Sequence, residues 1–129
     1  MSLVYPYDRD NFDPPAPVLV VSLTVPYPLS GVHIVRSRAL LDSGSDITVV
    51  PKWIVQDLHL RYVDEVIASG YDGVTKNTYV YSVKIIFDNL GELITRVLAE
   101  GYEYTLIGRD ILNEWSLFLK GQRKVFEIN

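Results

Sequence analysis

One short segment of the chain combines acidic, turn-forming and β-branched residues, and it occurs once. The segment reads Leu40-Leu41-Asp42-Ser43-Gly44-Ser45-Asp46-Ile47-Thr48-Val49-Val50-Pro51. The apolar residues before Asp42 indicate the end of a buried strand, and the two residues after it favour a tight turn. A β-branched strand follows and ends at Pro51, because proline has no N–H for a strand ladder. The pattern places a carboxylate at a strand end, where it can exchange protons with water or with a carbonyl oxygen.

A single carboxylate of this kind predicts a site made by two chains. Amide hydrolysis needs a base that takes a proton from water and an acid that gives one to the carbonyl oxygen. The chain has 129 residues, the length of one domain, and is too short for two lobes that each carry such a segment. Two copies of Asp42 facing each other across a two-fold axis could not both ionise readily, so they would share one proton and act together as acid and base.

Other interpretations of these residues are weaker. Asp-Ser-Gly alone is a common turn tripeptide, but an unpaired carboxylate is costly to bury between two apolar runs, which favours a functional Asp42. The oxygen spacing of a calcium loop is missing, and Ser43 and Ser45 lack the Gly-x-Ser-x-Gly context of a serine nucleophile. His33 and His59 stand between apolar residues with no third ligand, so they are predicted to be structural and no metal site is expected.

Around Asp42 the sequence resembles the retropepsin-like aspartic proteases of the retroviral and DNA-damage-inducible types. Their signature is two apolar residues followed by Asp, Ser or Thr, Gly, and Ala or Ser, and every position matches. Residues 106–112 resemble their second mark, an apolar run followed by Gly-Arg and a short helix, and residues 66–74 lie where the family has its glycine-rich flap. The resemblance spans residues 18–128. It implies an all-β fold, a closed retropepsin-like barrel of a single lobe with one short late α-helix.

The resemblance also implies a function. The chain would be a homodimeric aspartic endopeptidase that hydrolyses peptide bonds with water activated between Asp42 of each of two chains. Its partners would be a second copy of itself and a peptide or protein substrate that adds as a strand between flap and active loop, with no metal or organic cofactor. The alternative is a catalytically weak or inactive retropepsin-like module for dimerisation or peptide binding, because a fold alone does not guarantee the reaction. The intact Asp-Ser-Gly-Ser favours the enzyme.

Individual roles follow from the matched positions. Asp42 would be catalytic, and Ser43, Gly44 and Ser45 would form the active loop. Ser43 would join the two loops across the dimer axis, and Gly44 would form backbone hydrogen bonds with the bound peptide. The residues implied to bind substrate are Gly44, Asp46, Ile47, Val49, Gly70, Tyr71, Asp72, Gly73 and Leu106.

Two of these assignments have structural alternatives. Asp46 and Arg109 would form an ion pair beneath the active loop, from which Asp46 could reach the substrate backbone, but a purely structural pair is an equal alternative. Ile47, Val49 and Leu106 match positions that line apolar side-chain pockets in the family. Packing in the core is the competing role for each of them.

The remaining pattern predicts the elements that position the site. Residues 1–17 are rich in proline and aspartate and are predicted to be an extended or disordered N-terminal arm, followed by the protease-like domain in residues 18–129. β-Branched runs between turn residues predict strands, and Pro51 favours the start of a short helix. The predicted strands are 18–25, 32–41, 47–50, 62–69, 75–87, 92–99, 104–107, 116–120 and 123–128, and the predicted helices are 52–58 and 109–115.

Composition narrows the class of protein. The net charge of −4 and the pI near 5.0 argue against nucleic acid as a partner, because that affinity depends on clustered Lys and Arg. There is no apolar stretch long enough to cross a bilayer and no signal peptide, so a soluble, cytoplasmic protein without a membrane partner is expected. The chain has no cysteine, which excludes disulfides, thiol catalysis and thiolate metal sites.

Overall fold

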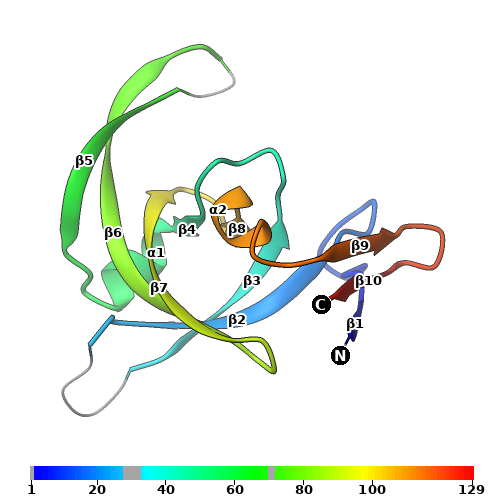
Figure 1. Cartoon of the computed structure of the whole chain (residues 1–129). Helices are drawn as coiled ribbons and strands as arrows, with labels where there is room; N and C mark the ends of the chain where they lie inside the picture. Colours follow the sequence, from blue (N-terminus) through cyan, green and yellow to red (C-terminus); the bar gives the residue numbers. More distant parts are fainter. Residues whose placement is uncertain (1, 28–32, 70–71) are drawn as a thin grey trace.

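The structure is a computed structural model that describes residues 2–27, 33–69 and 72–129 (Figure 1). Short strands dominate this part of the chain, and its two helices are each less than two turns long. In chain order the elements are β1 (Leu3–Pro6), β2 (Val18–Thr24), β3 (Val35–Leu41), β4 (Val49–Pro51), α1 (Lys52–Asp57), β5 (Tyr62–Ser69), β6 (Thr75–Phe87), β7 (Gly91–Glu100), β8 (Thr105–Ile107), α2 (Arg109–Leu112), β9 (Leu117–Lys120) and β10 (Val125–Ile128).

Six strands close into a barrel. Their order is β2-β3-β8-β4-β7-β6, and pairing between β2 and β6 joins the two ends of this series. Strand β5 pairs with the outer edge of β6 and extends the hairpin beyond the barrel, so that the β5–β6 ribbon arches over the rest of the molecule in Figure 1. The predicted all-β closed barrel is confirmed.

Alternation of side chains along the strands builds the core of the barrel. In β6, Val83, Ile85 and Phe87 are buried, whereas the residues between them are partly exposed. Val21 and Leu23 of β2 are fully buried and pair with Phe87 and Ile85, respectively. Each fully buried aliphatic side chain of this kind contributes about 1.5 to 3 kcal/mol to folding. The core therefore fixes the strands whose ends carry the site.

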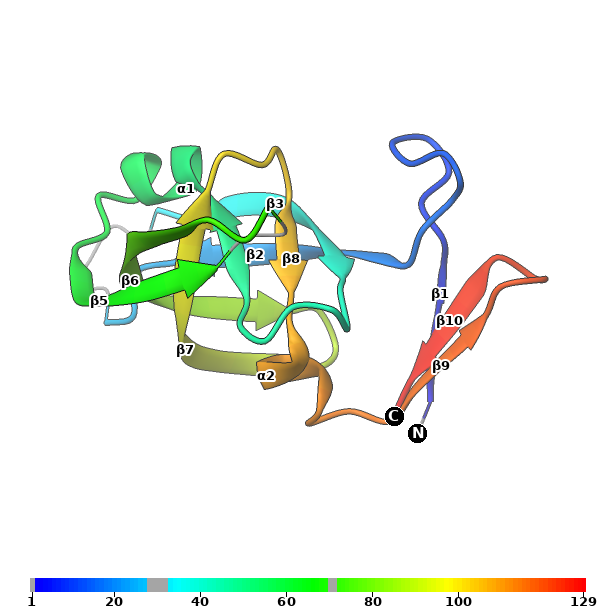
Figure 2. The same ribbon diagram turned by 90° about the horizontal axis from the view of Figure 1, so that it is seen from above.

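The N-terminal and C-terminal strands form a second, smaller sheet at one side of the barrel (Figure 2). Its order is β1-β10-β9, and Leu3 pairs with Ile128. Tyr5 of β1 stacks on Phe126 of β10 with ring centroids 5.2 Å apart, and both Phe126 and Ile128 belong to the hydrophobic core. The prediction of an extended or disordered arm missed β1, because a strand that depends on a partner more than 100 residues away leaves no local pattern.

Two predicted elements are shorter than expected, one because it ends early and the other because it begins late. The helix predicted for residues 109–115 ends at Leu112, and the chain continues as a turn in which the Trp115 N–H donates to the Leu112 carbonyl (3.1 Å). Ile111 and Leu112 are buried, so packing holds only this first turn. The predicted strand 32–41 begins at Val35 in the described part of the chain, whereas 62–69 and 75–87 match β5 and β6.

Candidate active site

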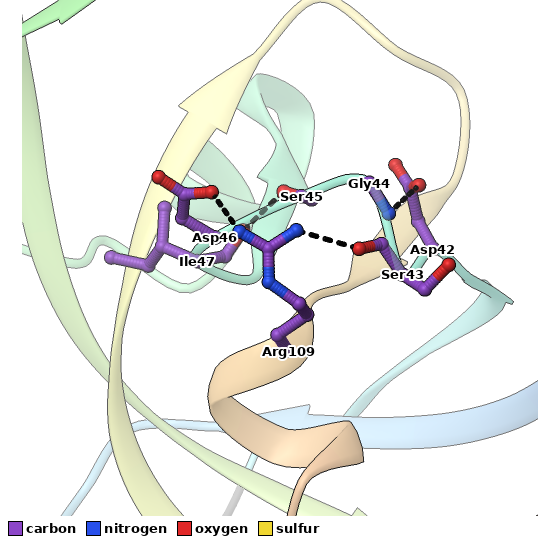
Figure 3. A network of polar contacts seen from close by, with 7 residues as sticks. All are labelled: Asp42, Ser43, Gly44, Ser45, Asp46, Ile47 and Arg109. Atoms are coloured by element: carbon purple, nitrogen blue, oxygen red, sulfur yellow. Dashed lines mark hydrogen bonds and ion pairs between the residues drawn. The ribbon is translucent and has the colours of Figure 1, made fainter.

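Asp42 directly follows β3, at the point where β3 and β8 run parallel. Its N–H donates to the carbonyl of Ile107 (2.9 Å), which continues the β3–β8 ladder by one residue. The Gly44 N–H donates to Oδ1 of Asp42 (3.0 Å; Figure 3), and the Ser45 N–H donates to the Asp42 carbonyl (3.1 Å). The side chain is half-buried. A strand end and backbone N–H groups of its own loop therefore orient this carboxylate.

Arg109, the first residue of α2, fastens the loop from below. Its Nη1 donates to the carbonyl of Ser43 (2.7 Å), and its Nη2 forms an ion pair with Oδ1 of Asp46 (Figure 3). Its backbone N–H donates to the carbonyl of Ser45 (2.8 Å). The planar guanidinium can hold both acceptors at once, which a lysine ammonium cannot do with the same geometry. One residue thus contacts three successive parts of the active loop.

A second connection between α2 and the loop is partly buried. Both oxygens of the Asp110 carboxylate accept from Thr48: Oδ2 from its N–H (3.1 Å) and Oδ1 from its hydroxyl (2.9 Å). The Thr48 hydroxyl accepts in turn from the Gly108 N–H (3.1 Å), and Thr48 is fully buried. Hydrogen bonds to an ionised group contribute more than neutral ones, about 1.5 to 3 kcal/mol. This network fixes the end of the loop where it enters β4.

Gly108 lies where α2 and the active loop approach most closely. A Cβ at this position would lie 2.7 Å from the carbonyl carbon of Ile47 and 2.9 Å from the carbonyl oxygens of Ile47 and Ser45. These are backbone atoms that the surrounding hydrogen bonds hold in place. Only glycine therefore fits between the β8 strand and the loop.

The residues predicted to bind substrate fall into different environments. Val49 is only 7 % exposed and pairs with Leu98 and Leu106, so its side chain lies within the barrel wall. Leu106 and Ile47 are half-buried. Ile47 borders a surface hollow beside the active loop, lined by Asp46, Ile47, Ser82, Ile94, Thr95, Arg96 and Asp110.

The described part of the flap turn has a tight-turn geometry. Oδ1 of Asp72 accepts from the Val74 N–H (2.9 Å), and Gly73 has a φ of +76°, a left-handed conformation that favours glycine. Asp72 and Gly73 are both exposed. The predicted substrate contacts Gly70 and Tyr71 lie outside the described residues.

Sequence reasoning missed two residues that hold the site. The sequence pattern places Thr48 only in a β-branched strand and Asp110 only in the late helix, yet they form the partly buried network described above. Their separation of 62 positions gives no local spacing to detect. The acidic residue directly after Gly-Arg indicates only a local hydrogen bond at the helix start, such as the one that Oδ1 accepts from the Ile111 N–H.

The described residues include no group of three or more His, Cys, Asp and Glu placed to hold a metal ion. His33, predicted to be structural, lies with Nε2 2.8 Å from Oδ2 of Asp57. No helix in this part of the chain is long and apolar enough to span a membrane.

Comparison with known proteins places this geometry in a family. The family model described as retroviral aspartyl protease matches residues 14–120. The chain is 23 % identical to the simian foamy virus (mac) protease, with a TM-score of 0.55, and the match covers 75 % of this chain and 92 % of that one. No curated protein sequence matches it.

Two other solved structures match over more of the chain. The protease of EIAV in complex with the inhibitor HBY-793 is 21 % identical with a TM-score of 0.59, over 85 % of this chain and 93 % of that one. A retropepsin-like aspartic protease from Rickettsia conorii is 12 % identical with a TM-score of 0.61, over 99 % and 90 %. At these identities the structures show a shared fold. Because the family model covers most of the sequence, the chain belongs to the retroviral aspartyl protease family, and its fold is that of a retropepsin-like aspartic protease domain.

Proposed function

We propose that the chain is an aspartic endopeptidase that works as a homodimer, with water activated between Asp42 of two identical chains. The observation that carries this proposal is the position of Asp42 at the end of β3, with one carboxylate oxygen held by the Gly44 N–H in a loop that α2 anchors at several points. The chain offers one such carboxylate, and the reaction needs two groups in opposite protonation states. A second copy of the chain supplies the other.

The chemistry follows from two such carboxylates at one site. Two like charges a few ångströms apart do not both ionise readily, so the pair holds one proton between them. The ionised member takes a proton from water as the water attacks the peptide carbonyl, and the protonated member gives its proton to the carbonyl oxygen. Arg109 keeps the loop in place through Ser43 and Asp46 and takes no proton itself, since a guanidinium stays charged.

The terminal sheet supports a place for the second copy. Its two outer strands, β1 and β9, have unpaired edges among the described residues. Val4, Phe118 and Leu119 on this sheet are 58 %, 52 % and 57 % exposed, respectively. An exposed strand edge with apolar side chains favours pairing with another chain. The dimer would bury these side chains and bring the ends of the two β3 strands together.

The substrate in this proposal is an extended peptide. It lies between the β5–β6 ribbon and the active loop, where backbone groups of the peptide can pair as they would in a sheet. Ile47 and the hollow beside it favour an apolar side chain at one position of the peptide, and Asp46 offers an exposed carboxylate for its backbone N–H. No metal or organic cofactor takes part in this reaction scheme.

The test combines activity with the state of association. Asp42→Asn should leave the dimer intact in a sizing or sedimentation measurement and reduce cleavage of a peptide library by at least about a hundredfold, because it removes the general base. The unmutated protein should show a bell-shaped, acidic pH profile. Asp88→Asn is the matched control, because Asp88 is exposed in the turn between β6 and β7, away from the active loop, and should leave cleavage unchanged.

Mixing the two kinds of subunit tests the shared site directly. With free exchange, cleavage should fall with the square of the fraction of unmutated subunits, since a mixed dimer has one competent carboxylate. A linear fall would mean that each chain acts alone. A strict monomer, or a dimer that cleaves nothing at any pH, would contradict the proposal and favour a retropepsin-like binding module instead.

A further inference from the structure

A second hollow lies between α1 and the base of the β5–β6 ribbon, which are neighbours in both Figure 1 and Figure 2. It has a volume of about 330 Å³, and the end of β7 closes it on a third side. Pockets for small ligands in proteins have volumes of about 300 to 1,000 Å³. We call this cavity the α1 hollow. Its polar and aromatic lining includes Lys52, Gln56, Lys76, Tyr79, Tyr81 and Glu100.

The α1 hollow lies on the side of the ribbon that faces away from the active loop. Side chains alternate along a strand, so Tyr79 and Tyr81 of β6 project to one side and Ser82 to the other. Ser82 lines the separate hollow beside the active loop, together with Ile47. A molecule in the α1 hollow would therefore contact the ribbon from behind, without entering the proposed path of the peptide.

The helix wall of the α1 hollow is held by the barrel core. Lys52, Val55 and Gln56 lie at positions i, i+3 and i+4 of α1, which places them on one face of the helix. Val55 is 8 % exposed, and the neighbouring Ile54 is fully buried in the core. The hollow thus has one wall fixed by the core and one wall formed by the ribbon.

The charged groups of the α1 hollow leave an excess of positive charge. Lys52 and Lys76 contribute two ammonium groups, and Glu100 contributes one carboxylate. Nζ of Lys76 lies 3.2 Å from Oε2 of Glu100, whereas none of the ion pairs among the described residues includes Lys52. The chain as a whole has a net charge of −4. A local positive charge in an acidic protein favours an anionic ligand at this place.

Two tyrosines give the α1 hollow an apolar wall. Tyr81 packs against the hydrophobic core, and Tyr79 is 46 % exposed. The Tyr79 ring is in contact with the ring of Tyr62, which belongs to β5, so the aromatic wall includes both strands of the ribbon. Tyrosine rings offer a large apolar surface on which a second aromatic ring packs favourably.

We propose that the α1 hollow binds a ligand that joins an aromatic ring to a single carboxylate, and that this ligand holds the ribbon against α1. The ring packs on Tyr79 and Tyr81, and the carboxylate lies near the Lys52 ammonium and the Gln56 amide. A free aromatic acid and the C-terminal aromatic residue of a peptide both present this chemistry. Because the ligand bridges the fixed wall and the ribbon wall, it favours the closed position of the ribbon.

Titration of the full chain with two matched probes tests this proposal. N-acetyl-L-phenylalanine has the carboxylate and N-acetyl-L-phenylalaninamide lacks it. The acid should bind about tenfold more tightly, because its carboxylate accepts charge-assisted hydrogen bonds. It should shift the NMR signals of residues 52–56 and 76–81 and slow hydrogen exchange of the β5 amides. A tetrapeptide that ends in Phe, added in the same way, separates the two sources: tighter binding than the free acid assigns a peptide end, and weaker binding a free acid.

Substitutions in the lining should change the affinity in opposite directions. Lys52→Met should weaken binding of the acid by about fivefold and leave the amide unchanged, because it removes one ammonium group. Glu100→Gln should strengthen binding of the acid by about fivefold, since it removes a carboxylate and releases Lys76 from its ion pair. A general disturbance of the fold would not produce both effects. Lys84→Met is the control, because Lys84 pairs with Glu92 outside the hollow and should change neither probe.

Three results would each overturn the inference. They are equal or absent binding of the two probes, NMR shifts confined to residues outside the lining, and weaker binding of the acid by Glu100→Gln. None of these measurements uses cleavage. A chain that binds the acid as expected but hydrolyses no peptide would contradict the proposed function and leave the α1 hollow as a ligand site.

Discussion

The active loop and the flap ribbon face each other across the proposed peptide site, and they are held in opposite ways. The loop between β3 and β4 is fastened to β8 and α2 through Gly108, Arg109 and Asp110, partly by buried hydrogen bonds. Strand β5, in contrast, pairs only with β6 in the described structure. Its Ile67 is 74 % exposed, and residues 72–77 on the other side of the turn are all exposed. One segment is fixed by the fold, and the other by one strand pairing and by exposed ion pairs to β7, Lys76 with Glu100 and Asp64 with Arg96.

The proposed peptide hydrolysis needs a rigid active loop and a mobile cover, which is the contrast between these two segments. Reacting groups must be held within a fraction of an ångström, which buried and mutually satisfied hydrogen bonds provide. A cover must open to admit an extended chain, and segments that move are drawn from regions with few buried contacts. The loop that carries Asp42 is therefore the rigid segment. The part of the β5–β6 ribbon above it has few contacts beyond the pairing of its own two strands.

The largest expected effect comes from disturbing the loop at its closest contact. Gly108→Ala would place a Cβ 2.7 Å from the backbone of Ile47, so the loop or β8 must shift. We expect a loss of about 2 to 3 kcal/mol in the free energy of unfolding, the range of an overpacked site, measured by denaturant titration. Gly121→Ala is the control, because nothing lies within 4 Å of a Cβ there. Equal effects of the two substitutions would show that the loop is not tightly packed.

The next effect concerns the partly buried hydrogen bonds between Thr48 and Asp110. Thr48→Val and Asp110→Ala should each destabilise the protein, and a double-mutant cycle should give a coupling of about 1 kcal/mol, because the Thr48 hydroxyl donates to Oδ1 of Asp110, whereas the bond from the Thr48 N–H to Oδ2 persists in Thr48→Val. The cycle uses free energies of unfolding. Thr48→Val combined with Asp88→Ala should be additive within about 0.5 kcal/mol, since these sites share no partner. Coupling no larger than this control would mean that α2 does not hold the loop through Asp110.

The flap should respond locally to mutation. The rings of Tyr62 of β5 and Tyr79 of β6 are in contact, tilted by 39° with centroids 4.7 Å apart, while both remain exposed. Tyr62→Ala should therefore change the free energy of unfolding by less than about 1 kcal/mol, but it should speed hydrogen exchange of the β5 amides. Ile67→Ala on the same strand removes a highly exposed side chain and should alter this exchange less. If faster exchange also appeared in β3 and β8, the β5–β6 ribbon and the active loop would not be held independently of each other.

The smallest expected effect is a pH dependence of the stability that the N-terminal arm contributes. The pKa of Asp8 is lowered by its hydrogen bonds with Asn11, so these bonds contribute stability above the ordinary Asp pKa of about 4, and this contribution is lost as the pH falls through the lowered value. Asp8→Asn should lower the melting temperature slightly at neutral pH, and the difference from the unmutated protein should vanish in acid. Asp10→Asn, which leaves these hydrogen bonds in place, should show no such convergence. A difference that grew in acid would contradict this assignment.

The local parts of the fold could be predicted from the sequence. β5 and β6 follow the residues expected for them, because each is a run of strand-forming residues bounded by turn residues. The loop around Asp42 could be recognised for the same reason, since its turn lies between two apolar runs. The all-β barrel followed from many short strands.

Contacts between distant segments could not be predicted. β1 exists because it pairs with β10; its own sequence, Leu3-Val4-Tyr5-Pro6, is apolar throughout and ends in proline, so it shows no alternation of apolar and polar residues. The contact of Asp110 with Thr48, and that of Phe12 with Tyr104, likewise depend on which strands the barrel places side by side. Substrate contact by Ile47 and Leu106 stays a prediction, whereas Val49 is nearly buried, which favours its packing role.

The pairing of β1 with β10 would allow a circular permutation of the polypeptide. Because Leu3 lies opposite Ile128, the two strands run side by side about 5 Å apart, and their outer ends meet at one edge of the small sheet. A linker of a few residues could join these ends into a ring. New termini opened in the turn at Gly121 would leave every barrel strand continuous, so a circular permutant with this order of elements should reach the same topology.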